Sequence, residues 1–400
     1  MTNLAPRAPG QGVDALKAAA DRALTFNDAK GARDLFEQAV ALSPGRFDLW
    51  VGLAAALRGL GDIQAAVGAL DHALSVDPRS FPALLMKASL LEQLGAPHQA
   101  GAAYGIALTQ LPPEGQMPAQ MRAAAERAKE IHLRYEAAMA QALRGDLSDI
   151  QAAVGGPAAR RLDQFIDQLA GRRKVYHQEP VLFHYPGLPE IEFIDREDLP
   201  FIEEFESHTT GIVADLAGVL AEDADGLEPY VNYPPNVPLD QWAELNRSPR
   251  WSGYHLLENG ERVEAHCRRC PRTMDAVALL PQPTTQGRSP AAMFSVLQPR
   301  TRIPPHHGVS NTRLVLHLPL VVPPDCGFRV GNETREWKVG QAWVFDDTIE
   351  HEAWNNSDQL RTVLICDIWN PYLAEEERAM VAAVMAAMDD FSGGVEDAGL

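Results

Sequence analysis

The chain has 400 residues, of which 46% are hydrophobic and 22% are charged. This length exceeds the about 100–200 residues of one ordinary core, so it predicts two or three domains, and the composition excludes disordered and fibrous proteins. The formal net charge of −19 would repel phosphate backbones and anionic membrane surfaces. Nucleic acid is therefore excluded as an expected partner.

No segment predicts export or insertion into a membrane. The N-terminal residues lack the apolar run of a secretory signal, and the most apolar stretch, residues 314–322, is interrupted by His317 and Pro319. Four cysteines are too few for a disulfide framework, and the pair Cys267 and Cys270 lacks the second pair of ligands that a closed zinc site requires. These features predict a cytoplasmic protein with no membrane insertion.

A repeat of 34 residues runs through residues 13–114, where Pro44, Pro78 and Pro112 mark its period. The same spacing relates two further sets of residues, one small and one large: Ala39, Ala73 and Ala107; Phe36, Leu70 and Tyr104. Small residues let paired helices cross closely, large ones fill the grooves, and a proline ends the second helix. The pattern resembles three tetratricopeptide repeats, which implies a surface for a protein or peptide. A helical spacer is the alternative.

The segment after the repeats continues as helix over residues 121–142 and 150–170, where apolar residues recur at three-to-four spacing. From residue 177 the chain is rich in proline, which forbids a continuous helix and predicts a domain boundary. The predicted organisation is a flexible N-terminus, a repeat domain, a helical connector and a catalytic domain: residues 1–12, 13–114, 115–176 and 177–400.

The last part of the chain is predicted to be rich in strands, after one amphipathic helical segment over residues 197–222. Short β-branched or aromatic runs are separated by turn residues: 292–297, 313–322, 328–330, 336–339, 341–345 and 360–369. Many short strands at even spacing predict a sandwich or jelly roll. A helix over residues 374–391 closes the chain.

Four of the twelve histidines fall within 46 residues of this strand-rich region: His306, His307, His317 and His351. A barrel brings distant strand ends to one mouth, so His306 and His351 could share a metal. Their spacing resembles the facial triad of an Fe(II) site, although Gly308 stands where that triad has its carboxylate. Arg361 follows on the final strand, where a cation could bind the distal carboxylate of 2-oxoglutarate.

The motifs around these residues are extensive: Trp251-Ser252, Ser295 in FSVLQP, His306-His307-Gly308, Asn311, Arg313, His317-Leu318, Asn332-Glu333-Thr334, Phe345-Asp346-Asp347, Glu350-His351-Glu352, Trp354, Arg361 and Asp367-Ile368-Trp369. With them, residues 251–370 resemble the catalytic domain of the aspartyl/asparaginyl β-hydroxylase family. The larger members of that family also carry tetratricopeptide repeats ahead of the oxygenase.

The resemblance implies a double-stranded β-helix that binds Fe(II) through His306 and His351 alone, because the family itself has glycine at the position of Gly308. It further implies that three residues hold 2-oxoglutarate: Arg361, Ser295 and His317. Considered singly, His317 could instead be a hydrogen-bonded core histidine, and Arg361 could form a surface ion pair on a strand.

The substrate side departs from the family pattern. A family arginine that contacts the substrate carboxylate is Val315 in this chain. Arg313 remains as a second basic residue that could contact the substrate, and Trp251 is a further candidate.

We therefore expect an Fe(II)- and 2-oxoglutarate-dependent dioxygenase that uses O₂ to β-hydroxylate Asp or Asn side chains. Its substrate would be a peptide or protein bound with help from the repeats. Two alternatives are a non-catalytic repeat scaffold with a ligand-sensing barrel, and a hydroxylase of a non-peptide substrate such as a lipid acyl chain.

Overall fold

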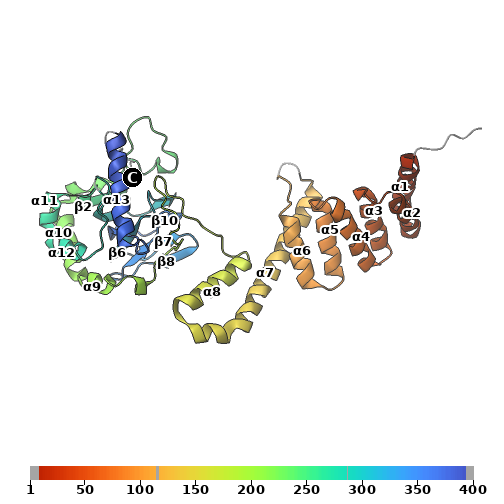
Figure 1. Ribbon diagram of the computed structural model, residues 1–400, viewed down its shortest axis with the longest axis horizontal. Coiled ribbons are helices and arrows are strands. Elements are labelled where there is room, and N and C mark those ends of the chain that lie inside the picture. The colour runs from red at the N-terminus through yellow and green to blue at the C-terminus, as the bar shows by residue number, and fades with distance from the viewer. Residues whose placement is uncertain (1–8, 114–116, 286, 393–400) are drawn as a thin grey trace, which may run out of the picture. The chain divides into compact units, whose positions relative to one another are not determined.

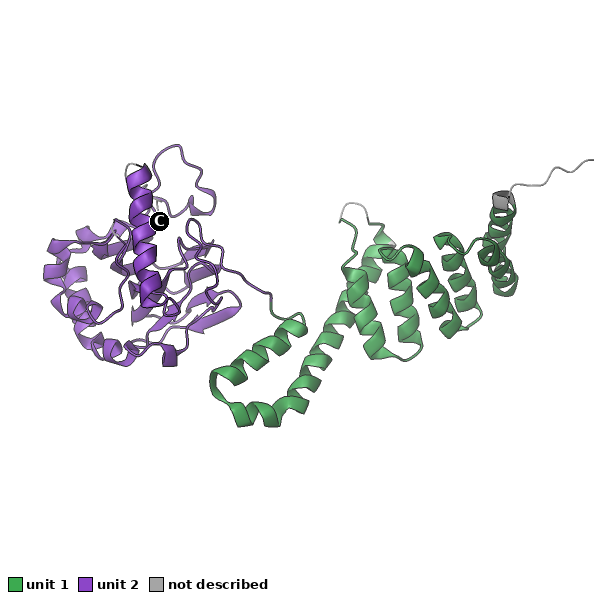
Figure 2. Ribbon diagram, viewed as in Figure 1, with its two compact units in different colours: residues 1–173 green, residues 174–400 purple. Residues whose placement is uncertain are grey.

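The computed structural model describes residues 9–113, 117–285 and 287–392 (Figure 1). The chain divides into two compact units, residues 1–173 and residues 174–400 (Figure 2). The first is helical and the second contains antiparallel sheets, which confirms the predicted fold class of a repeat array followed by a β-rich domain. Most of the predicted flexible N-terminus lies outside the described residues.

The first unit begins with three helix hairpins stacked side by side (Figure 1). Their helices are α1 (Pro9–Thr25), α2 (Ala29–Leu42), α3 (Phe47–Gly59), α4 (Ile63–Val76), α5 (Phe81–Gln93) and α6 (Pro97–Leu108). Pro44, Pro78 and Pro112 each follow the second helix of a pair, as the repeat predicted. Asp28 and Asp62, one repeat apart, cap α2 and α4 by accepting hydrogen bonds from the backbone N–H groups of Gly31 and Ala65.

Close helix packing explains which residues repeat. The alanines at 39, 73 and 107 are completely buried, so neighbouring helices approach there without a side chain between them. Phe36 is also completely buried, and its ring lies against the backbone of Gly52 in α3. A Cβ atom added to Gly52 would stand 2.2 Å from Cζ of Phe36, so only glycine fits at this contact.

Two further helices complete the unit: α7 (Ala119–Val154), which packs against α6, and α8 (Gly156–Leu169), which contacts α7. The predicted helical segments over residues 121–142 and 150–170 fall on these helices, and α7 also includes the residues between the two segments. The break between α7 and α8 comes at Gly155 and Gly156, whose φ angles of +62° and +55° are incompatible with a continuing α-helix.

The second unit contains two antiparallel sheets. The larger sheet consists of β1 (Glu228–Pro229), β2 (Trp251–Glu258), β4 (Ala292–Leu297), β11 (Arg361–Trp369), β6 (Arg313–Val321) and β9 (Trp343–Phe345) in that spatial order, with β3 (Glu261–Arg262) on β2. The smaller sheet has the order β5 (Thr301–His306), β10 (His351–Asn355), β7 (Cys326–Val330) and β8 (Glu333–Glu336).

Helices cover the outer face of the larger sheet. They include α9 (Ile202–Ser207), α10 (Thr209–Glu222), α11 (Glu264–Arg269) and α12 (Pro271–Val277), whereas α13 (Glu375–Ser392) packs on Trp369 and Leu373 at the end of β11. The predicted helical segment over 197–222 is thus two helices that meet at His208. All four cysteines are free and buried.

The alternation along the central strands separates the helix-covered core from the site. Leu314, Leu316 and Leu318 on β6 pack into the core beneath the helices. Val315, one of the residues between them, belongs to the second core, which lies between the two sheets. Within residues 9–113, 117–285 and 287–392, no helix has both the length and the hydropathy needed to cross a bilayer.

We predict that Gly52→Ala lowers the stability of the helical unit by about 1–3 kcal/mol, because the added methyl group overlaps the buried Phe36 ring. Gly68→Ala is the matched control, since Gly68 lies within α4 and an added Cβ would meet nothing within 4 Å. That change should stabilise the unit by about 0.5–1 kcal/mol through helix propensity. Chemical unfolding followed by circular dichroism measures both, and equal shifts for the two variants would contradict the packing argument.

Candidate functional site

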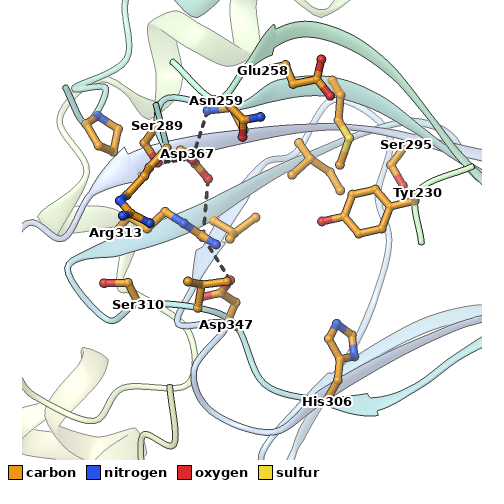
Figure 3. A pocket seen from close by; sticks show the side chains of 18 of the residues that line it. Tyr230, Glu258, Asn259, Ser289, Ser295, His306, Ser310, Arg313, Asp347 and Asp367 are labelled. Atoms are coloured by element: carbon orange, nitrogen blue, oxygen red, sulfur yellow. Dashed lines mark hydrogen bonds and ion pairs between the residues drawn. The ribbon is translucent and has the colours of Figure 1, made fainter. Parts of the chain in front are cut away.

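A cavity of about 570 Å³ lies between the two sheets and is lined by inward-facing residues of both (Figure 3). The structure brings to this cavity every residue that the sequence singled out for the site: Trp251, Ser295, His306, Arg313, His317, His351 and Arg361. They come from strands that are distant in sequence but adjacent in the two sheets.

Two histidines lie side by side in the cavity. His306 ends β5 and His351 begins β10, and the two are register partners with ring centroids 4.0 Å apart. Nδ1 of His306 donates to the carbonyl oxygen of Pro304 at 2.8 Å, and Nδ1 of His351 donates to that of Ile349 at 3.1 Å. A carbonyl can only accept, so both rings carry their proton on Nδ1 and keep a lone pair on Nε2.

Burial keeps both rings neutral. It lowers the pKa of His351 to about 4, and it lowers that of His306 well below the ordinary value, with the neighbouring His351 as a second cause. Two neutral imidazoles with oriented Nε2 atoms are suitable ligands for a divalent transition metal. His307 differs from the pair, because its Nε2 lies 3.8 Å from a carboxylate oxygen of Glu179.

The position of a third side-chain ligand is filled by another residue. A Cβ atom on Gly308 would stand 2.1 Å from Cγ of Asp347, so the Asp347 carboxylate occupies the space that a residue 308 side chain would need. In the part of the chain that the structure describes, no three His, Cys, Asp or Glu side chains come together as a metal site. The arrangement therefore suits a metal held by two histidines, with its remaining positions open to other ligands.

Arg361 also lines the cavity, at the start of β11. Its residue exposure is only 1%, and its Nε and Nη1 have no hydrogen-bond partner within the described residues. The guanidinium lies 5.0 Å from the ring centroid of Trp337, and burial lowers its pKa to about 10. The interpretation as a surface ion pair is thus wrong. A buried guanidinium without a counter-ion is a fitting partner for a bound carboxylate.

Ser295 and His317 add polar groups near Arg361. Trp251 donates its Nε1–H to Oγ of Ser295 at 3.0 Å, which leaves the Ser295 hydroxyl proton available to a ligand. Nδ1 of His317 is buried and has no partner within the described residues, and burial followed by the charge of Arg361 lowers the pKa of His317 well below its ordinary value. We call Arg361, Ser295 and His317 the unpaired end of the cavity.

Arg313 lies in a different environment. Its Nη1 is 3.0 Å from Oδ2 of Asp347 and 3.5 Å from Oδ1 of Asp367, so the guanidinium stands between two buried carboxylates (Figure 3). We call Arg313, Asp347 and Asp367 the paired end of the cavity. The Asp367 carboxylate is held in turn by the hydroxyl of Ser289 and the backbone N–H of Ala291.

Sequence reasoning did not find Tyr230, whose ring stacks on Trp251 with centroids 4.0 Å apart. Its hydroxyl points into the cavity (Figure 3), and burial raises its pKa to about 12. Tyr230 directly follows the two-residue strand β1, which has no recognisable alternation. Only its aromatic type, within a run that also holds Tyr233, could have suggested a role.

Comparison with known proteins gives matches for both units. Residues 208–371 match the family model described as aspartyl/asparaginyl beta-hydroxylase, and residues 23–90 match a tetratricopeptide-repeat model. The human protein named aspartyl/asparaginyl beta-hydroxylase is 36% identical over 149 residues, which cover 37% of this chain and 19% of that protein.

Two other relatives share more of their length with the chain. The Rhizobium tropici protein named ornithine lipid ester-linked acyl 2-hydroxylase is 33% identical over 196 residues, or 48% of this chain and 66% of that protein. The Xenopus tropicalis aspartate beta-hydroxylase domain-containing protein 2 is 28% identical over 218 residues, covering 52% of this chain and 55% of the relative. The chain thus spans about a fifth of the human relative and up to two thirds of the others reported.

We predict that Gly308→Ala destabilises the protein by about 1–3 kcal/mol, because the added methyl group would overlap the Asp347 carboxylate. Asp347→Gly should also destabilise it, since Arg313 loses one partner. In the double variant the overlap is gone, so the combined cost should be smaller than the sum of the two. Urea unfolding of the four proteins measures this coupling, and additive costs would show that the two positions do not compete for space.

Proposed function

We propose that the chain is an Fe(II)- and 2-oxoglutarate-dependent dioxygenase, since residues 208–371 match the aspartyl/asparaginyl beta-hydroxylase family model and residues 23–90 match a tetratricopeptide-repeat model. Its substrate would be an Asp or Asn side chain of a peptide or protein. The main support for the proposal is a single cavity. It contains two neutral, oriented imidazoles in one part and a buried arginine without a counter-ion in another.

His306 and His351 would hold the iron through their Nε2 atoms. The backbone carbonyls of Pro304 and Ile349 fix the ring orientations and tautomers, so the lone pairs are in place before the metal binds. With iron and 2-oxoglutarate bound, O₂ supplies the oxidising chemistry that converts 2-oxoglutarate to succinate and CO₂ and places a hydroxyl group on a substrate carbon. The protein's part is to bind, to orient and to exclude water.

The unpaired end would hold the distal carboxylate of 2-oxoglutarate. Arg361 offers two unpartnered donor nitrogens, Nε and Nη1, and Ser295 offers its hydroxyl, while Trp337 covers the guanidinium from one side. Such an ion pair is shielded from water, so it is stronger than the same pair at the surface. An anion bound there would also supply a negative charge beside Arg361, which has no acidic partner within the described residues.

Two alternatives carry different expectations. A relative named as a lipid acyl hydroxylase and the apolar residues Met293, Ile303 and Ile365 in the cavity favour an acyl chain as the second candidate substrate. The repeat array favours a polypeptide, because stacked repeats present an extended surface for a chain. A non-catalytic scaffold would have no need for the oriented histidine pair. Mass spectrometry of peptides and of lipids after incubation with Fe(II) and 2-oxoglutarate separates the three.

We expect His306→Ala and His351→Ala each to abolish 2-oxoglutarate turnover, because one remaining imidazole cannot retain a labile Fe(II). His307→Ala is the matched control in the same segment and should retain most of the turnover, since its ring lies toward Glu179. Succinate formation and the metal-to-ligand charge-transfer band of the anaerobic complex report the two effects. An inactive His307→Ala protein beside an active His306→Ala protein would refute the ligand assignment.

The contribution of the repeats can be tested with a protein of residues 174–400. The cut falls after residue 173 because α7 packs on α6 and belongs to the helical unit. We predict that this protein still binds Fe(II) and 2-oxoglutarate, while its kcat/KM for a long peptide falls by at least about tenfold, or roughly 1.4 kcal/mol, and that for a very short peptide hardly changes. Equal losses for both peptides would indicate a damaged β domain, and no loss would leave the repeats without a part in substrate binding.

A further inference from the structure

Every arginine that lines the cavity already has a function or a partner. Within the described residues these arginines are Arg288, Arg313 and Arg361. Arg288 forms an ion pair with Asp389 and lies over the ring of Phe183 at 5.1 Å. Arg361 belongs to the unpaired end, which the proposed function assigns to 2-oxoglutarate.

Arg313 is the remaining candidate for a substrate carboxylate, and it is already neutralised. Its guanidinium lies between Asp347 and Asp367, at 3.0 Å and 3.5 Å, and both acids are more than nine-tenths buried (Figure 3). Two carboxylates beside one guanidinium leave a net negative charge at the paired end. A third carboxylate arriving from a substrate would be repelled rather than bound.

The surface between the two ends is apolar. Val315 is 7% exposed and stands on β6 between Arg313 and His317, the neighbouring residues on the same strand face. Asp367 on β11 and Phe345 on β9 are its register partners. A carboxylate placed here would lose its water without gaining a cation, which is costly. An amide costs less to desolvate, and the buried Oδ1 of Asp347, which has no partner within the described residues, can accept a hydrogen bond from an amide N–H.

The rim of the cavity is acidic. Glu228 on β1 and Glu258 at the end of β2 are exposed and line the cavity, and neither side-chain carboxylate has an ion-pair or hydrogen-bond partner among the described residues. We use "rim" for these two residues. Their charges favour a cationic group on the segments of substrate that enter and leave the cavity.

From these observations we propose that the cavity selects an asparagine-type amide over an aspartate-type carboxylate as the reacting side chain, in a peptide with basic residues on either side of it. The inference rests on the proposed function, because it concerns the substrate of that same site. It rests on named charges and their partners: the occupied Arg313, the apolar Val315 and the unpaired carboxylates of the rim.

The test uses four synthetic peptides that differ only in the central residue, Asn or Asp, and in the flanking residues, Lys or Glu. Isothermal titration calorimetry of each peptide with the full chain, in the presence of 2-oxoglutarate, measures affinity without turnover. We expect the Asn peptide to bind at least about tenfold more tightly than the Asp peptide with either flank. Lysine flanks should tighten binding further at low salt and lose much of this advantage at about 0.5 M salt, where exposed charges are screened.

Two variants locate the selectivity. Val315→Arg should tighten binding of the Asp peptide by at least about tenfold, whereas Val321→Arg, at a 37% exposed position on the same strand that does not line the cavity, should leave it unchanged. Val315→Arg adds a large residue at a buried position, where it can disturb folding. Variants of the two exposed rim residues therefore provide an independent test. The combined change Glu228→Gln and Glu258→Gln should remove most of the lysine-flank advantage, and Glu203→Gln on α9, away from the cavity, should not.

A parallel assay distinguishes failure of this inference from failure of the proposed function. If the full chain forms succinate from 2-oxoglutarate with Fe(II), but the Asp peptide binds as tightly as the Asn peptide or more so, then the selectivity is wrong and the dioxygenase assignment stands. If no peptide and no buffer condition yields succinate or the charge-transfer band, the proposed function itself is wrong. A lysine-flank advantage that survives the rim variant would overturn the part of the inference that concerns flanking residues.

Discussion

The whole β domain depends on the burial of its larger sheet on both faces. Along β11, Leu364, Cys366 and Ile368 pack beneath the helices, while Ile365 and Asp367 between them line the cavity. Because side chains alternate with a period of two, a slip of one residue would move the leucines into the cavity and the polar residues into the core. The apolar contacts under α9–α12 therefore fix the register that aligns Arg313, His317 and Arg361 along one cavity.

The stable sheets also permit polar groups that would be costly in isolation. Nε and Nη1 of Arg361 and Nδ1 of His317 are buried without partners within the described residues, and each such group costs free energy in the folded state. The fold supports them because the surrounding strands are covered by apolar contacts on their other face. Unsatisfied polar groups gathered in one part of one cavity are what a protein built to receive a charged ligand is expected to show.

The sequence predicts those helices and strands that are encoded by a local residue pattern. The repeats were predictable because the residues at their helix crossings recur every 34 positions, and β4 and β11 were predictable as continuous apolar strands. Strand β5 was missed because Pro304 and Pro305 lie within it, and only its place at the edge of the smaller sheet tolerates them. The motifs identified the residues of the cavity, but the overlap of Asp347 with the position of Gly308 depends on distances across strands, which no local pattern encodes.

Arg313 and Arg361 show why residue type alone does not define a binding site. Both line one cavity from adjacent strands of the same sheet. Arg313 has two buried carboxylates beside it, so an approaching anion meets an occupied guanidinium and a net negative charge. Arg361 has no acidic partner within the described residues, so an anion that reaches it provides the first compensating charge. The difference lies in where the two aspartates stand: Asp367 is on β11 beside β6, and Asp347 follows β9, so both reach Arg313. It makes one arginine a place to bind an anion and the other a part of a surface that excludes one.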